Sequence, residues 1–161
     1  MDKSSAIINQ SFTQTQCMTK ITRESVDEML KLFENKDMEK ILSLFSENAV
    51  LYDPHYPEIE MVGKAAIRRG FEFAFAGIKK TNFNIIRFWS DEQGIATEVD
   101  TYHLFNNGRE IKLQQVFLVE FQNGLISRMR SFVPYPPHGI GGFLPKVIRI
   151  IWKLTGKIKK G

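Results

Sequence analysis

The chain has 161 residues, of which 43% are apolar and 25% charged, a composition typical of one ordinary globular domain. Its net charge of +4 is uneven, because residues 140–161 contain six lysine and arginine residues and no acid, which leaves −2 on the rest; nucleic acid is therefore not an expected partner. The single cysteine, Cys17, excludes an internal disulfide framework and a multi-cysteine zinc site, and it fits a cytoplasmic location.

The first predicted elements are a polar leader and a helical hairpin. Residues 1–20 lack the apolar run of a secretory signal and are expected to be disordered. Apolar residues then recur at helical spacing over residues 26–33 and again over residues 38–45. Thr22 or Ser25 can cap the first helix, and Asp37 can cap the second.

A strand, a loop and a third helix are expected next. The strand covers residues 49–53 and ends at Asp53-Pro54, because proline lacks a ladder donor and favours extended backbone before it. The third helix is expected over residues 64–77, where the alternation of residues 71–75 is the most ambiguous pattern in the chain.

The second half of the domain has the pattern of a β-meander. Asn-Gly and Gln-Gly turn signals separate long runs rich in β-branched and aromatic residues. Helices first and sheet afterwards predict an α+β fold. The expected strands are residues 82–90, 95–105, 109–121 and 125–133.

This order of elements resembles the nuclear transport factor 2-like superfamily, in particular its SnoaL-like (polyketide cyclase) and ketosteroid-isomerase-like branches. The resemblance covers about residues 22–135 and is carried by residues 39–54, which end in Asp-Pro, and by Gly-Lys-Ala-Ala-Ile at residues 63–67. It implies a curved antiparallel sheet wrapped around the N-terminal helices into a cone, an apolar pocket and a homodimer. The expected units are a leader (1–20), a cone domain (21–138) and a basic amphipathic C-terminal helix (139–161).

The resemblance also implies which side chains face the pocket. Strand alternation divides each strand into two sets, and an error of one residue in register would invert a set. His103 falls on the face opposite the pocket, which makes it an expected dimer-side residue. The pocket-facing residues implied are Asp53, Glu98, Asp100, Tyr102, Gln115, Phe117, Met129 and Ser131, with Met29 on the first helix.

Asp53 matches the position of the isomerase's proton-shuttling aspartate and is the expected general base, with Asp100 as its acid or orienting partner and His55 at the pocket mouth. Each role has an alternative. Asp53 can be a turn residue, His55 an ordinary loop histidine, and Glu98 the partner of Arg87 or Arg109 across neighbouring strands.

This sequence lacks residues that two mechanisms known for related proteins require. The isomerase's oxyanion donors correspond to Met29 and Phe117, which cannot donate hydrogen bonds, so ketosteroid isomerisation is not expected. Of the Asp-Arg-Asp set of limonene-epoxide-hydrolase-like members, Asp100 matches one aspartate, but Glu98 replaces the arginine and Ser131 the other aspartate.

Two functions therefore stay open. The first is an enzyme of isomerase, cyclase or hydrolase type that moves a proton or activates water on a small apolar ligand. The second is a module of the same fold that binds a ligand or a partner without chemistry. No cofactor is expected, and no metal either, because the three histidines are scattered along the chain.

The C-terminal segment is expected to form a basic amphipathic helix from Pro145. Its apolar side can lie on an anionic membrane through residues 143–161, cover the cone mouth, or pack in the homodimer. The predicted apolar side comprises Leu144, Val147, Ile148, Ile151, Leu154 and Ile158, and the basic side comprises Lys146, Arg149, Lys153, Lys157 and Lys160.

Overall fold

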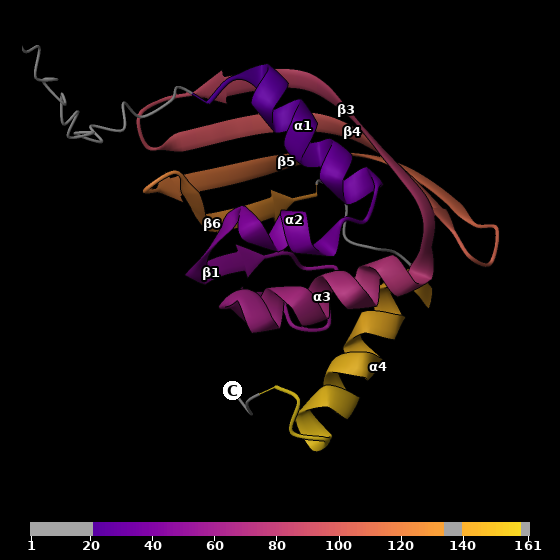
Figure 1. Cartoon of the computed structure of the whole chain (residues 1–161). Coiled ribbons are helices and arrows are strands. Elements are labelled where there is room, and N and C mark those ends of the chain that lie inside the picture. The colour runs from indigo at the N-terminus through magenta and orange to yellow at the C-terminus, as the bar shows by residue number, and fades with distance from the viewer. Residues whose placement is uncertain (1–20, 134–139, 159–161) are drawn as a thin grey trace, which may run out of the picture.

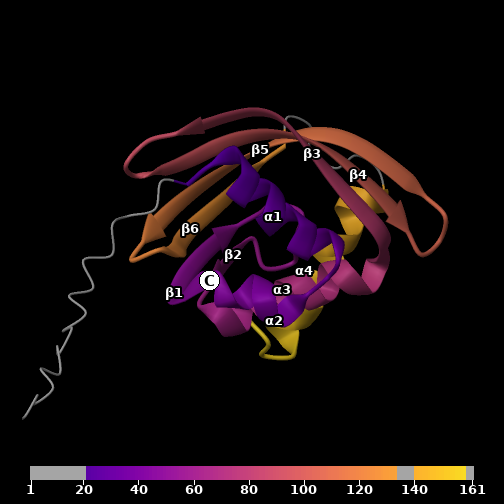
Figure 2. The same ribbon diagram turned by 45° about the horizontal axis from the view of Figure 1, so that its top comes forward.

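The computed structural model describes residues 21–133 and 140–158, so the predicted leader lies outside the described residues. A curved sheet arches over α1 and α3 (Figures 1 and 2). The elements are α1 (Arg23–Glu34), α2 (Met38–Ser43), β1 (Phe45–Tyr52), β2 (Glu60–Val62), α3 (Lys64–Gly77), β3 (Ile78–Ser90), β4 (Gly94–Phe105), β5 (Glu110–Gln122), β6 (Leu125–Phe132) and α4 (Ile140–Leu154).

The predicted α+β class and the curved sheet are confirmed. Within the described residues, six strands form one sheet in the order β2-β1-β6-β5-β4-β3. Strands β3 to β6 form the predicted antiparallel meander, whereas β1 pairs with β6 in parallel, which makes the sheet mixed. The last turn of the meander has Asn123 and Gly124 at φ 53° and 76°, a backbone shape that suits the twist of a two-residue hairpin.

The core lies between the helices and the concave face of the sheet. Phe71 of α3 is 2% exposed and is its centre, with Phe33 of α1 edge-on at 5.1 Å and Phe45 of β1 at 6.1 Å between ring centroids. Thr22 caps α1 through a reciprocal pair with Ser25, so the first of the two expected caps is used. The helices therefore cover the concave face around β1. Polar side chains line the same face along β4, β5 and β6.

The C-terminal helix begins at Ile140, five residues before the predicted start at Pro145. It extends below α3, on the side of α3 away from the sheet (Figure 1). Trp152 packs edge-on against Phe73 of α3 at 6.2 Å, and Arg149 Nε donates to the Pro57 carbonyl at 2.7 Å. Arg149 belongs to the predicted basic side, and together with Trp152 it forms the side through which the helix docks. Within the described residues, no helix is long and apolar enough to cross a bilayer.

Candidate functional site

A carboxylate and an imidazole meet where β1 ends. Asp53 Oδ1 accepts the His55 backbone N–H at 2.8 Å and lies 2.9 Å from His55 Nδ1. Because a carboxylate only accepts, Nδ1 of His55 is the donor in this pair and Nε2 is left for another partner. The Asp53 side chain is 15% exposed and that of His55 is 31% exposed. Within the described part of the chain, Asp53 Oδ2 has no hydrogen-bond partner, so it is available to a bound molecule.

The backbone turn explains why this pair forms. Asp53 bonds the N–H two residues on, which is the geometry of an Asx-turn, and Pro54 fixes the intervening φ. The turn brings His55 back over Asp53 instead of letting it follow the strand direction. The alternative reading of Asp53 as a turn residue is thus part of the structure, and it coexists with a free carboxylate oxygen.

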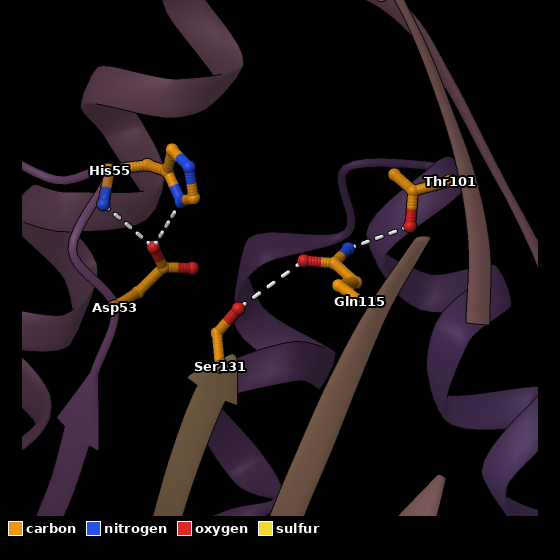
Figure 3. A network of polar contacts seen from close by, with 5 residues as sticks. All are labelled: Asp53, His55, Thr101, Gln115 and Ser131. Atoms are coloured by element: carbon orange, nitrogen blue, oxygen red, sulfur yellow. Dashed lines mark hydrogen bonds and ion pairs between the residues drawn. The ribbon is translucent and has the colours of Figure 1, made fainter. Parts of the chain in front are cut away.

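A row of three polar side chains crosses the sheet beside Asp53. Gln115 of β5 donates from Nε2 to Thr101 Oγ1 at 2.7 Å and accepts at Oε1 from the Ser131 hydroxyl at 3.2 Å. All three are nearly buried, at 2% to 7% exposed. Figure 3 shows the row next to Asp53 and His55. Leu51 pairs with Met129, so continuing that register by two residues places Asp53 beside Ser131 on the concave face.

The hydrogen bonds within the row determine which of its groups are left for a ligand. Both ends of the Gln115 amide are occupied, one by Thr101 and one by Ser131. The Thr101 hydroxyl accepts from Gln115, so its own hydrogen can be donated to a ligand oxygen. The Thr101 hydroxyl is therefore an uncharged hydrogen-bond donor on a nearly buried part of the sheet.

His103 also faces this site, and the expectation that it lies on the opposite, dimer-side face is wrong. Its Nδ1 lies 2.8 Å from Thr81 Oγ1, and its ring packs edge-on against Phe83 at 6.2 Å. Burial lowers the pKa of His103, and the nearby charge of His55 lowers it further, whereas Asp53 opposes the shift. His103 is therefore held in its neutral form close to the Asp53–His55 pair.

The prediction that Glu98, Asp100 and Tyr102 face the pocket is wrong. Thr97 pairs with Phe117 and Val99 with Gln115, and directly paired residues share a face of the sheet. The intervening residues of β4 therefore lie on the outer face. Asp100 is exposed there, so it does not converge with Asp53.

The outer residues have local partners instead. Glu98 Oε2 binds Arg87 Nη1 at 3.0 Å, which confirms the cross-strand pair considered as the alternative role for Glu98. Partial burial and the neighbouring Glu110 carboxylate raise the pKa of Tyr102. These side chains stabilise the outer surface of the sheet and are outside the candidate site.

Apolar side chains complete the concave face. Phe117 is 7% exposed and lies 6.4 Å from Phe83 between ring centroids, and Met29 and Met129 pack against the same core. Tyr56 follows His55 in the loop and packs on Phe71 at 6.3 Å. Burial, together with the Asp53 charge, raises the pKa of Tyr56 strongly, so its hydroxyl stays protonated.

Sequence reasoning missed Tyr56, Thr101 and His103 as parts of this cluster. A usable signal was present in β4: the set with Ile95, Thr97 and Val99 is the more apolar and β-branched of the two, which favours it as the buried set. Within residues 21–133 and 140–158, no group of three or more His, Cys, Asp or Glu side chains is arranged to hold a metal ion.

Comparison with solved structures supports the fold. A nuclear transport factor 2-like protein of unknown function from Burkholderia pseudomallei is 16% identical, with 68% of this chain and 88% of that chain covered at a TM-score of 0.62. A protein of ketosteroid isomerase-like fold from Catenulispora acidiphila, in complex with trimethylamine, is 14% identical, with 70% and 86% covered at 0.62. A Mycobacterium tuberculosis protein in complex with estradiol-17β-hemisuccinate is 19% identical, with 65% and 86% covered at 0.58.

A search of curated protein sequences found no match. The family comparison gave a clear result, because the model of the SnoaL-like domain matches residues 26–129. That range runs from α1 into β6 and contains the Asp53–His55 pair, His103 and Gln115, whereas α4 lies beyond it. The chain therefore belongs to the SnoaL-like domain family, and its fold is that of nuclear transport factor 2-like proteins.

Proposed function

We propose that the protein binds a small, largely apolar molecule on the concave face of its sheet, and that Asp53 acts there as a general base. The observation that carries the proposal is the Asp53–His55 pair, whose free carboxylate oxygen lies beside the Thr101–Gln115–Ser131 row. A reaction of isomerase, cyclase or hydrolase type needs a proton acceptor held in one orientation, which this pair supplies, and groups that orient the ligand, which the row supplies.

The composition of the face supports an apolar ligand. Phe83, Phe117 and Met129 supply apolar contacts, and the polar row supplies few but oriented hydrogen bonds. The ligand of the Mycobacterium tuberculosis neighbour, estradiol-17β-hemisuccinate, has the same character: a rigid apolar body with oxygen atoms at its ends. We expect the ligand of this protein to carry a carbonyl or hydroxyl oxygen within reach of Thr101.

The proposed chemistry divides the work between the two oxygens of Asp53. His55 and its backbone N–H hold Oδ1, which fixes the carboxylate in one orientation. Oδ2 then takes a proton from a ligand carbon next to a carbonyl, or from a water molecule that attacks the ligand. Thr101, at the far end of the row from Asp53, donates to a second, remote oxygen of the ligand and so orients it, and the neutral His103 keeps the site free of a competing charge.

A second candidate is binding without catalysis. The observation that favours it is that Met29 and Phe117, which the resemblance to ketosteroid isomerase places at the oxyanion-donor positions, pack as apolar wall. A lost donor of that kind costs on the order of 100-fold to 1000-fold in rate. In this case the polar row orients a ligand, and Asp53 with His55 only closes the turn.

We further propose a homodimer that forms through the outer face of the sheet. Trp89 of β3 and Phe132 of β6 are 53% and 45% exposed there, and Leu118 of β5 lies between their strands. Large exposed apolar side chains on several neighbouring strands mark interaction surfaces. Light scattering of the full chain, compared with the Trp89→Glu variant, tests this assembly.

The catalytic proposal is tested by deuterium exchange. The full chain is incubated with 2-tetralone in heavy water, and loss of the acidic C–H signals is followed by NMR. Asp53→Asn should slow the protein-dependent exchange by about 100-fold or more while the Asx-turn, which asparagine can also form, keeps the fold. Asp100→Asn is the matched control, since it makes the same chemical change on the outer face, and it should exchange like the native protein.

Binding is measured separately, by calorimetric titration with estradiol-17β-hemisuccinate. A protein that binds this probe but shows no Asp53-dependent exchange supports the second candidate and contradicts the general base. Retained exchange in Asp53→Asn contradicts the assignment of Asp53. Absence of both binding and exchange contradicts the proposed ligand class.

A further inference from the structure

The C-terminal helix exposes a continuous apolar face to solvent. Five of its large apolar side chains are between 49% and 75% exposed, which is unusual for residues on one helix of a folded protein. The exposed apolar face of α4 is defined as Phe143, Leu144, Ile150, Ile151 and Leu154. At about 100° per residue, these positions cluster on one side of the helix.

The exposed apolar face takes no part in packing within the chain, because α4 docks on the domain through its other side. Trp152 contacts Phe73, and Arg149 binds the Pro57 carbonyl. Both residues lie roughly opposite the exposed apolar face on the helical projection. The anchored side thus holds α4 in an orientation that turns Leu144, Ile151 and Leu154 away from the domain. The alternative in which the apolar side covers the cone mouth is therefore wrong within this chain.

The charges of residues 140–161 indicate what kind of partner covers the exposed apolar face of α4. Lys146 and Lys153 are two turns apart along one edge of the exposed apolar face, and the sequence continues with Lys157, Lys159 and Lys160. Residues 140–161 contain no acid. Apolar side chains bordered by lysines suit the boundary between the acyl chains and headgroups of an anionic bilayer.

A second copy of the helix is a poorer occupant. Pairing two α4 helices face to face would bring the lysines of both copies together, with no carboxylate on either helix to neutralise them. A span is excluded by length, since 15 residues at about 1.5 Å each reach about 22 Å, whereas a bilayer core is about 30 Å thick. The helix can lie on a membrane but cannot cross it.

We propose that α4 docks the protein on membranes rich in anionic lipid, with the exposed apolar face inserted at the headgroup boundary and Lys146 and Lys153 on the lipid phosphates and carboxylates. This surface is separate from the proposed ligand site, since α4 docks on Phe73 and the Pro57 carbonyl through Trp152 and Arg149, and the exposed apolar face lies on the opposite side of the helix. The inference therefore does not depend on the function of Asp53.

The test is flotation of the full chain with lipid vesicles. One set contains phosphatidylcholine with about 30% phosphatidylserine, and the other contains phosphatidylcholine alone. We expect binding to the anionic set only, weakened by about tenfold or more when salt is raised from about 0.05 M to about 0.5 M. Equal binding to both sets, or no binding to either, overturns the proposal.

Two variants locate the surface. Ile151→Glu with Leu154→Glu should reduce anionic vesicle binding by about tenfold or more, because it places carboxylates on the inserting face. The matched control, Val62→Glu with Leu125→Glu, makes the same change at exposed positions on the sheet and should bind like the native chain. Unchanged binding in the α4 variant overturns the proposal.

A milder pair keeps the test decisive if the glutamate variant does not fold. Lys146→Gln with Lys153→Gln preserves helix propensity and should weaken anionic binding and its salt dependence together. Circular dichroism and melting confirm that each variant is folded. If the native chain ignores vesicles and Ile151→Glu with Leu154→Glu instead converts a dimer to a monomer in light scattering, the face is an interface between copies and the proposal is wrong.

Discussion

The two faces of β4 carry polar residues of different kinds. On the concave face Thr97, Thr101 and His103 are neutral and partnered, whereas on the outer face Glu98 and Asp100 are charged. The helices cover much of the concave face, so a charge there needs a partner or a route to solvent, and Asp53 at the end of β1 has both, since it pairs with His55 and is 15% exposed. The carboxylates of Asp53 and Asp100 are chemically the same. Their positions on the sheet, at the strand end of the concave face and on the outer face, separate the candidate catalytic residue from the structural one.

The largest expected effect comes from moving a carboxylate across β4. Val99 is fully buried, so Val99→Asp should lower the free energy of unfolding by about 3 kcal/mol or more through an unpaired buried charge. Asp100→Val, the reciprocal change on the outer face, should stay within about 0.5 kcal/mol. Urea denaturation measures both, and similar losses in the two variants would show that the faces do not differ as described.

A smaller effect is expected from neighbouring glutamines on opposite faces of β5. Gln115→Leu should lower the free energy of unfolding by about 1–3 kcal/mol, because the buried Thr101 and Ser131 hydroxyls lose their partner. Gln114→Leu removes an exposed amide and should change stability by about 0.5 kcal/mol or less. Thermal melting at fixed pH checks both variants. A neutral Gln115→Leu would mean that the polar row contributes nothing to stability.

The smallest effect concerns pH and His103. Burial lowers its pKa in the folded chain below the ordinary value of about 6.5, so the unfolded chain takes up the proton first as the pH falls. Stability from this group is therefore present above pH 6.5 and is lost as the pH falls through the lowered pKa of the folded state. His103→Gln should flatten that part of the profile. Melting between about pH 5 and pH 7 would contradict the prediction if native and variant proteins lose stability in parallel.

Several elements were predictable because their signals are local. The Thr22 and Asp37 caps, the helical spacing of α1 and the Asn-Gly turn before β6 depend on residues a few positions apart. The Asp53-Pro54 turn belongs with them, since its Asx geometry involves three consecutive residues. The ambiguous alternation of residues 71–75 became helix because Phe71 and Phe75 both pack inward, stacked at 6.0 Å.

The sequence by itself determined the order of the helices and of the longer strands, the two alternating sets of each predicted strand and the amphipathic character of α4, whereas the short β2 lies in the stretch expected as loop. Only the tertiary structure decided that β6 lies parallel to β1, that His103 and not Asp100 faces the Asp53–His55 pair, and that α4 docks through Arg149 and Trp152. The physical reason is the range of the interactions. Periodicity divides a strand or helix into two faces, but which face is buried depends on the register and on partners that are distant in the chain.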